Sequence, residues 1–436
     1  MKKNFFRFIF NLFNLYKIVA RIKSPILVAV VLFLTSSILK SAKSSSPNII
    51  YIHKGIGIDD ILSMYKNSKK INYIVIQSAL IREIFKVFFG EKIYSISSIH
   101  TDYHNDLVHF PLEKKNQYKK FIKRVFDYFQ KICNYDGFLT SNYVYSYLQE
   151  LSNYANENKK IYIILYKEGL VNKNFVEKFI QRYTNNSLNA DLMLTYNSFI
   201  KNAFIQSNIK GVQNTSIVSI GIPRLDNYKN LKKSNHHIVL FSFLPKDKFS
   251  YLENEAFYDL NFQNKIEKIS NQFHSNVIKY ANENPSKKLI IKTKFPPKYM
   301  NYIEAIINQN NLKISKNISV INSGDPLDII RNANTVMGFN STTLLEALLL
   351  KKKIVIPNFT EILSNDSNID YFTSYEKIVY KVSSYNEMNY AINSNFKNNS
   401  TDIDSFLEKY IHHNNFSASK NAENTILLNL NCKDSK

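Results

Sequence analysis

A row of polar residues separates an apolar run from an apolar helical pattern within residues 323–357. Gly338 ends the apolar run, and the row that follows contains Asn340, Ser341, Thr342 and Thr343. The run predicts a strand, and the residues after the row predict a helix. A helix start presents unpaired N–H groups and the positive end of the helix dipole, which together favour a phosphate. The row could instead only cap the helix while its neighbours pack the core.

Polar residues at two other predicted strand ends could bind the same anion. Ser242 follows the predicted strand 237–241. Lys292 and Lys294 stand at the end of the predicted strand 288–291. In open α/β sheets, ligands bind at the carboxyl ends of strands, and ammonium groups there suit the phosphates of a nucleotide donor. Solvated lysines in a lysine-rich chain are the alternative.

Three further residues complete the predicted donor site. Asp325 precedes Pro326 and is expected to cap a short helix ahead of the polar row. Glu346 follows the row by one helical turn, where it would bind donor hydroxyls or remain a plain surface residue. Arg224 lies in a turn opened by Gly-Ile-Pro and could reach an anion with its planar guanidinium.

Acidic residues near strand ends are candidates for proton transfer. Glu168 comes directly after the apolar run 161–165, so it is the first candidate for a general base that deprotonates an acceptor hydroxyl. Asp59 and Asp60, at the start of a helix after the turn 54–57, are the second candidates. A structural role at a helix start is an equally open alternative for Glu168. The turn lacks the third glycine of a dinucleotide fingerprint, and we predict no cofactor.

No metal site is predicted either. Four potential ligands lie close together in the sequence: His100, Asp102, His104 and Asp106. They would have to converge in space to hold a metal, and a solvated polar loop is the simpler interpretation. The two cysteines, Cys133 and Cys432, are far apart and fit a reducing compartment.

Strands and helices alternate from residue 44 onward, which predicts an α/β protein with parallel sheets. A chain of 436 residues is too long for one ordinary domain. We expect one α/β domain over 44–230 and a second over 236–400. A polar linker would join them, and a C-terminal helix and tail would occupy 401–436.

The N-terminal segment 1–43 contains basic residues and no acidic one. Between residues 5 and 23 the polar positions form one narrow stripe on an otherwise apolar helix. The second apolar run, 26–39, would extend about 21 Å as a helix, short of the ~30 Å hydrocarbon core. We expect a helical segment at the inner face of the cell membrane, held by anionic lipid. A buried helix pair is the alternative.

The formal net charge of +22 raises the question of nucleic acid. The lysine excess is spread over every segment, and no nucleic-acid-binding motif accompanies it. We therefore expect no nucleic-acid partner.

Five segments in order resemble the nucleotide-sugar half of GT-B glycosyltransferases, above all the bacterial enzymes that make surface polysaccharides such as capsule and lipopolysaccharide. These segments are residues 221–226, 242–245, 292–294, 325–328 and 338–346. The polar row and its helix read G-x-N-S-T-T-L-x-E-A-L in such enzymes, and G-F-N-S-T-T-L-L-E-A-L here. The likeness covers roughly residues 220–425. It departs at Asn415-Phe416, where many relatives carry an acidic Asp-Gly pair.

The resemblance implies two Rossmann-like domains that face a cleft, with 44–230 as the acceptor domain and 236–400 as the nucleotide-sugar domain. It also implies a sugar donated from a nucleotide sugar, and no required metal. The acceptor would be a surface-polysaccharide or lipid-linked glycan, and the enzyme would be cytoplasmic and peripheral to the membrane. Three alternatives remain: a nucleotide-sugar 2-epimerase, a glycerol-phosphate transferase on the same fold, and a non-catalytic membrane-peripheral scaffold.

Overall fold

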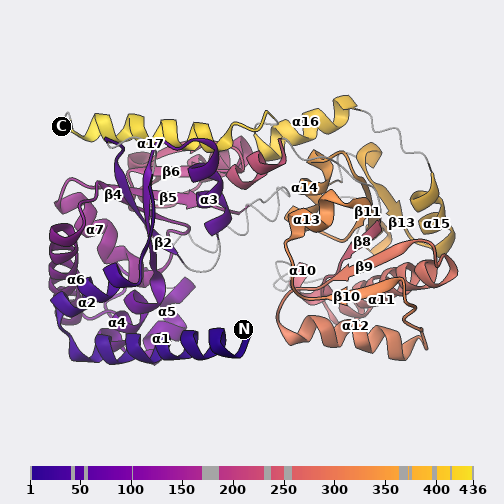
Figure 1. Cartoon of the computed structure of the whole chain (residues 1–436), viewed down its shortest axis with the longest axis horizontal. Coiled ribbons are helices and arrows are strands. Elements are labelled where there is room, and N and C mark those ends of the chain that lie inside the picture. The colour runs from indigo at the N-terminus through magenta and orange to yellow at the C-terminus, as the bar shows by residue number, and fades with distance from the viewer. Residues whose placement is uncertain are drawn as a thin grey trace. The chain divides into compact units, whose positions relative to one another are not determined.

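The structure is a computed structural model that describes residues 2–40, 45–53, 57–100, 102–168, 186–229, 237–249, 258–362, 372, 376–394, 400–412 and 415–434. It divides into two compact units (Figure 1). Among the described residues, the first unit contains 2–168, 186–227 and 415–434, and the second contains 228–412. Each unit has its own sheet, so the predicted α/β class with two parallel sheets is confirmed.

The first unit has a seven-stranded sheet in the order β1-β3-β2-β4-β5-β6-β7, parallel except for the edge strand β1. Its strands are β1 Ser37–Leu39, β2 Asn48–His53, β3 Asn72–Gln77, β4 Gly137–Thr140, β5 Ile161–Tyr166, β6 Leu192–Thr195 and β7 Ser216–Ser219. Tyr51, Leu139, Ile163 and Leu192 pair across four neighbouring strands, and all are 0% exposed. A sheet covered on both faces explains why these strands are continuous apolar runs.

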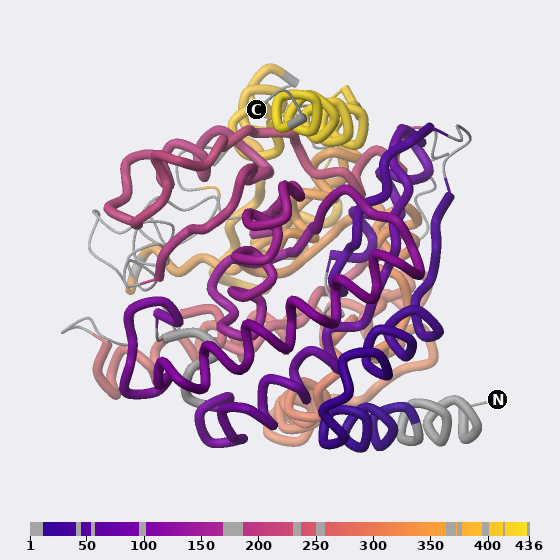
Figure 2. The backbone as a smooth tube through the Cα atoms, turned by 90° about the vertical axis from the view of Figure 1, so that its left-hand side faces the viewer, coloured from indigo at the N-terminus to yellow at the C-terminus, as the bar shows by residue number. Residues whose placement is uncertain are grey.

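Helices cover both faces of this sheet (Figures 1 and 2). They are α1 Lys2–Ile22, α2 Pro25–Leu34, α3 Ile58–Asn67, α4 Ser78–Phe89, α5 Glu91–His100, α6 Leu112–Ile132, α7 Gln149–Glu157, α9 Ser198–Ile205 and α17 Ala418–Asp434. The C-terminal helix α17 packs on α3 in this unit. Asp226 accepts hydrogen bonds from the Ala418 and Ser419 amides at the start of α17. The predicted tail 401–436 is therefore divided, because α17 belongs to the first unit and α16 to the second.

The apolar run 26–39 forms two elements instead of one. Ser24 caps α2, and the hydroxyls of Thr35 and Ser36 donate to the carbonyls of Val31 and Phe33, which ends the helix. The next residues form β1, which pairs antiparallel with β3. The inner side chains of α2 are buried, and α2 contacts α6. Among the residues that the structure describes, no helix is both long and apolar enough to cross a membrane.

The second unit has a six-stranded parallel sheet in the order β10-β9-β8-β11-β12-β13. Its strands are β8 His237–Phe241, β9 Lys288–Lys292, β10 Ile318–Ile321, β11 Ala333–Met337, β12 Lys353–Pro357 and β13 Tyr380–Val382. Its helices are α10 Pro245–Phe249, α11 Leu260–Glu283, α12 Pro297–Gln309, α13 Pro326–Arg331, α14 Thr342–Leu349, α15 Tyr385–Asn393 and α16 Ser400–Ile411. Ile291, Leu240, Met337 and Val355 pair across four strands and are 0% exposed, so they form the centre of the core.

The strand orders fix where each sheet can bind a ligand. In the second unit the chain passes from β8 to β9 and β10 on one side, then to β11, β12 and β13 on the other. In the first unit the corresponding reversal lies between β2 and β4. Such reversals open a crevice at the carboxyl ends of the strands, where open α/β sheets bind ligands.

Candidate functional site

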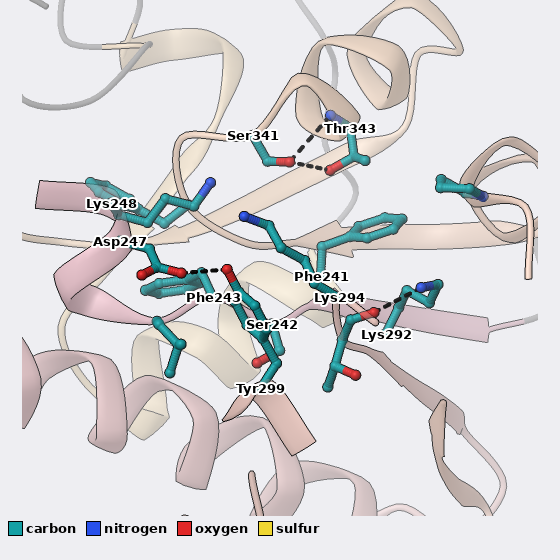
Figure 3. A pocket seen from close by; sticks show the side chains of 14 residues that line it. Phe241, Ser242, Phe243, Asp247, Lys248, Lys292, Lys294, Tyr299, Ser341 and Thr343 are labelled. Atoms are coloured by element: carbon teal, nitrogen blue, oxygen red, sulfur yellow. Dashed lines mark hydrogen bonds between the residues drawn. The ribbon is translucent and has the colours of Figure 1, made fainter. Parts of the chain in front are cut away.

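The crevice of the second unit contains a cavity of about 160 Å³ (Figure 3). Residues after β8, β9 and β11 line it, together with the starts of α10, α12, α13 and α14. The lining residues are Phe241, Ser242, Phe243, Leu244, Asp247, Lys248, Lys292, Thr293, Lys294, Tyr299, Pro326, Phe339, Ser341 and Thr343. The sheet order therefore brings together three segments that are distant in the sequence.

Lysines give this cavity its charge. Lys248 is largely buried, and its Nζ donates to the Asn340 carbonyl oxygen at 2.6 Å. Burial, with a smaller effect of the nearby Lys294, lowers the pKa of Lys248 to about 7. Lys292 donates to the Thr293 carbonyl oxygen at 2.8 Å, and burial also lowers its pKa. Both ammonium groups are held by neutral carbonyls, so an anion in the cavity would stabilise their charged forms.

The one carboxylate among the described residues that line the cavity is already engaged. Asp247 forms an ion pair with Lys298 at 2.9 Å and accepts a hydrogen bond from the Tyr299 hydroxyl. Hydrogen bonds from these two partners outweigh desolvation and lower the pKa of Asp247. Among the described residues, no carboxylate lies within ion-pair distance of Lys248, Lys292 or Lys294. The cavity thus has an excess of positive charge.

The polar row supplies the start of α14. Ser341 is the N-cap, and its Oγ lies 2.8 Å from the Thr343 Oγ1 and 3.4 Å from the Thr343 amide nitrogen. Asn340 has a φ of 41°, in the left-handed region that asparagine tolerates. At Gly338 a Cβ would lie 3.1 Å from the Phe241 carbonyl oxygen, so the β11 end can approach β8 closely. Hydroxyls and the helix N-terminus therefore face the same cavity as the lysines.

The predicted donor residues differ in where they lie. Ser242, Lys292, Lys294, Ser341 and Thr343 line the cavity. Gly338, Asn340 and Thr342 belong to the same turn without being lining residues. Asp325 is exposed and caps α13 through the Leu327 amide at 2.9 Å. Glu346 is 7% exposed and accepts a hydrogen bond from the Tyr228 hydroxyl at 3.2 Å.

The sequence analysis missed Lys248, Asp247 and Tyr299. The first two lie on α10, which begins at Pro245 directly after the β8 end. A proline that starts a helix close to a strand end was a usable signal, because it places the next turn of the helix beside the crevice. Tyr299 lies on α12, which begins shortly after the predicted lysines.

The crevice of the first unit gathers a second group of polar residues. Gly57 has a φ of 93°, and a Cβ there would lie 3.1 Å from the Tyr51 hydroxyl, 3.6 Å from Ser141 Cβ and 3.9 Å from Lys167 Cδ. These neighbours come from β2 and from the ends of β4 and β5. Residues 54–56 of the predicted turn lie outside the described residues.

Glu168, the first candidate base, follows β5 at this edge. Burial raises the pKa of Glu168, and the Lys167 charge opposes that effect. Burial lowers the pKa of Lys167. Burial also lowers the pKa of His53, although the Asp59 carboxylate raises it in part. Asp59 is exposed at the start of α3. A carboxylate with a raised pKa is a plausible proton acceptor near neutral pH.

Asp60 and Arg224 bind each other. Asp60 is 1% exposed and accepts from the Arg224 amide at 3.0 Å and from the Tyr196 hydroxyl at 2.6 Å. The Arg224 Nη1 lies 3.4 Å from the Asp60 carboxylate and 2.9 Å from the Tyr196 hydroxyl. This buried network ties α3 to the turn after β7 within the first unit.

The polar loop before α6 forms local hydrogen bonds. Asp102 accepts from the His104 amide, the His104 Nε2 lies 3.1 Å from the Gln149 Oε1, and Asp106 pairs with His109. Throughout the described ranges, no group of three or more His, Cys, Asp or Glu residues is placed to hold a metal ion.

Comparisons with known proteins give distant structural likenesses only. No protein-family model matches the chain, and no curated protein matches its sequence. The chain is similar to S. aureus MnaA solved with UDP, at 13% identity and a TM-score of 0.48, over 88% of this chain and 97% of that one. It is also similar to UDP-GlcNAc 2-epimerase from Neisseria meningitidis, bound to UDP-GlcNAc, at 12% identity and a TM-score of 0.45, over 87% of this chain and 99% of that one. A third similar structure is the wall teichoic acid polymerase TagF, at 13% identity and a TM-score of 0.45, over 71% of this chain and 76% of that one.

Proposed function

We propose that the protein is a glycosyltransferase that takes a sugar from a nucleotide-sugar donor bound in the second unit. The lysine-lined cavity at the reversal of the β8–β13 sheet carries this proposal. It combines three lysines, several hydroxyls and a helix start within one small volume. A nucleoside diphosphate matches that combination because its two phosphates require both charge and N–H donors.

The same groups would assist the chemical step. When the bond between the sugar and the phosphate breaks, negative charge develops on the departing diphosphate. Lys248 on α10 and Lys292 and Lys294 at the end of β9 are positioned to stabilise that charge, and the Ser341 and Thr343 end of α14 adds the helix dipole. Donors that are fixed before the reaction lower the barrier more than mobile ones.

Proton removal from the acceptor is assigned to the first unit. Glu168 is proposed as the general base, with Asp59 as the second candidate. Asp60 was proposed beside them, but its position in the network with Arg224 and Tyr196 suits structural support better. The acceptor is proposed to be a surface-polysaccharide or lipid-linked glycan, which would bring the enzyme to the cytoplasmic face of the cell membrane.

A thermal-shift screen against UDP-, GDP-, CMP- and CDP-linked sugars, and CDP-glycerol, tests donor binding. A ligand present at a hundred times its Kd stabilises the folded protein by about 2.7 kcal/mol. We expect one nucleotide class to stand out, and Lys292→Met to lose most of that effect. Lys288→Met is the matched control, because Lys288 is exposed at the opposite end of the same strand.

Product analysis with the identified donor separates the possible reactions. Transfer to a glycan acceptor supports the proposal. Conversion of the donor to its 2-epimer without an acceptor would replace the proposal with an epimerase. Transfer of glycerol phosphate would identify the related polymerase reaction. Absence of any nucleotide response would leave the scaffold as the better explanation.

A further inference from the structure

Over residues 12–22, helix α1 has one buried and one exposed apolar face. Tyr16, Val19 and Ala20 are at most 2% exposed, on a helix that contacts α4. Leu15, Ile18 and Ile22 are 41%, 58% and 56% exposed. Their spacing of three and four residues places them in one stripe along the helix. Exposed apolar residues that align in one stripe are typical of an interaction surface.

Basic residues follow the stripe. Lys17 and Arg21 are exposed and lie one helical turn apart on the row beside it. The first acidic residue of the whole sequence is Asp59, so α1 and α2 contain no carboxylate. We call this surface the α1 face; it is formed by Leu15, Lys17, Ile18, Arg21 and Ile22. It therefore combines an apolar stripe with charged residues that are all cationic.

We propose that the α1 face docks on an anionic lipid bilayer, with the helix lying in the plane of the interface. An anionic surface satisfies both features at once, since the apolar stripe enters the acyl boundary while the cations meet phosphate headgroups. A second copy of the chain fits less well, because a symmetric contact would bring Lys17 and Arg21 of both copies together. Helix α2 is a poorer contact, since its central apolar side chains are buried and its exposed ones, Ile26 and Leu34, stand at opposite ends.

The α1 face would hold the transferase where a lipid-linked acceptor is available, and this role of the face rests on the proposed function. Its geometry does not depend on catalysis. The two can therefore fail separately, and vesicle binding is measured without donor or acceptor.

Co-sedimentation of the full chain with vesicles provides the test. We expect binding to vesicles that contain phosphatidylglycerol, little binding to pure phosphatidylcholine, and a loss of binding with added salt. Each basic residue near such a surface contributes about fivefold, so Lys17→Gln with Arg21→Gln is expected to weaken binding about 25-fold. Ile18→Ser with Ile22→Ser is expected to weaken binding to both vesicle types.

Ile205→Ser is the matched control, because Ile205 is a 53%-exposed apolar residue on α9 of the same unit. Circular dichroism melts confirm that each variant is folded. Absence of wild-type binding to anionic vesicles, or an equal loss in the control, would overturn the proposal. A change from dimer to monomer in the Ile18 and Ile22 variant, with vesicle binding unaltered, would assign the face to a second copy. Vesicle binding without any nucleotide response would refute the transferase and leave the α1 face intact.

Discussion

Replacing Lys248 with methionine tests the electrostatics of the lysine-lined cavity most directly. The side chain is largely buried, and the lowering of its pKa from 10.5 to about 7 corresponds to about 5 kcal/mol against the charged form below pH 7. Its hydrogen bond to the Asn340 carbonyl oxygen offsets about 2 kcal/mol of that cost. Lys248→Met should therefore stabilise the ligand-free protein at pH 6 by about 3 kcal/mol.

The sign of the pH dependence follows from proton binding. The unfolded chain keeps the lysine proton up to pH 10.5, whereas the folded protein releases it near pH 7. Wild-type stability therefore rises with pH between these values, and the advantage of Lys248→Met shrinks over the same window. Urea unfolding at several pH values measures this, with Lys288→Met as the control at an exposed site.

The nucleotide donor should reverse the order of stability. A bound diphosphate restores the charge on Lys248, so binding takes up a proton and the affinity falls up to about tenfold per pH unit above pH 7. Calorimetry in buffers of different ionisation enthalpy detects that proton directly, and Lys248→Met should lose both the uptake and at least tenfold in affinity. A destabilised Lys248→Met protein at pH 6, or a donor affinity that is constant from pH 6.5 to 8.5, would refute this reasoning.

Three other substitutions test separate parts of the chain. Glu168→Gln should reduce the transfer rate at least a hundredfold while leaving donor binding unchanged, and an unchanged rate would exclude Glu168 as the base. Because burial raises the pKa of Glu168, the wild-type rate should fall with decreasing pH already above pH 4.5. Asp60→Asn should lower the free energy of unfolding in urea by about 3 kcal/mol, because it leaves Arg224 and Tyr196 around a neutral amide. A loss below about 1 kcal/mol would contradict the role given to that network. Glu423→Gln should lower the free energy of unfolding by about 1–2 kcal/mol. The two carboxylate oxygens accept hydrogen bonds from the Lys70 amide and the Tyr73 hydroxyl, and in the variant one of these donors would face the NH₂ group of the glutamine. Burial raises the pKa of Glu423, so stability should decrease as the pH rises from 4.5 to that value, and this slope should be absent in Glu423→Gln.

Local patterns were sufficient to predict part of the lining of the cavity. Ser242, Lys292 and Ser341 each lie where a strand ends and a turn begins, and an apolar run followed by polar residues marks such a point in any parallel sheet. The carboxyl ends of parallel strands share one edge, so predicting three strand ends also predicted that their residues would be neighbours. The order of the strands was not needed for that step.

Features that depend on distant partners could not be read in this way. Asp60 lies at a helix start, like many solvated carboxylates, and its partner Arg224 is 164 residues away. The run 26–39 is equally apolar whether lipid or α6 covers it, and only the tertiary structure assigns α2 to the core and Ser37–Leu39 to the sheet edge. Hydropathy measures the need for burial, without indicating what provides it.

Charge shows the same difference between composition and position. The net charge of +22 is spread along the chain and identifies no partner by itself. In the second unit, however, Lys248, Lys292 and Lys294 line one cavity whose only lining carboxylate among the described residues, Asp247, is held by Lys298 and Tyr299. Desolvation makes the Lys248 and Lys292 ammonium groups more costly than a surface lysine, and that cost is recovered when an anion binds. The local imbalance, which the total charge does not reveal, is therefore the feature on which the proposed binding of a phosphate-bearing ligand depends.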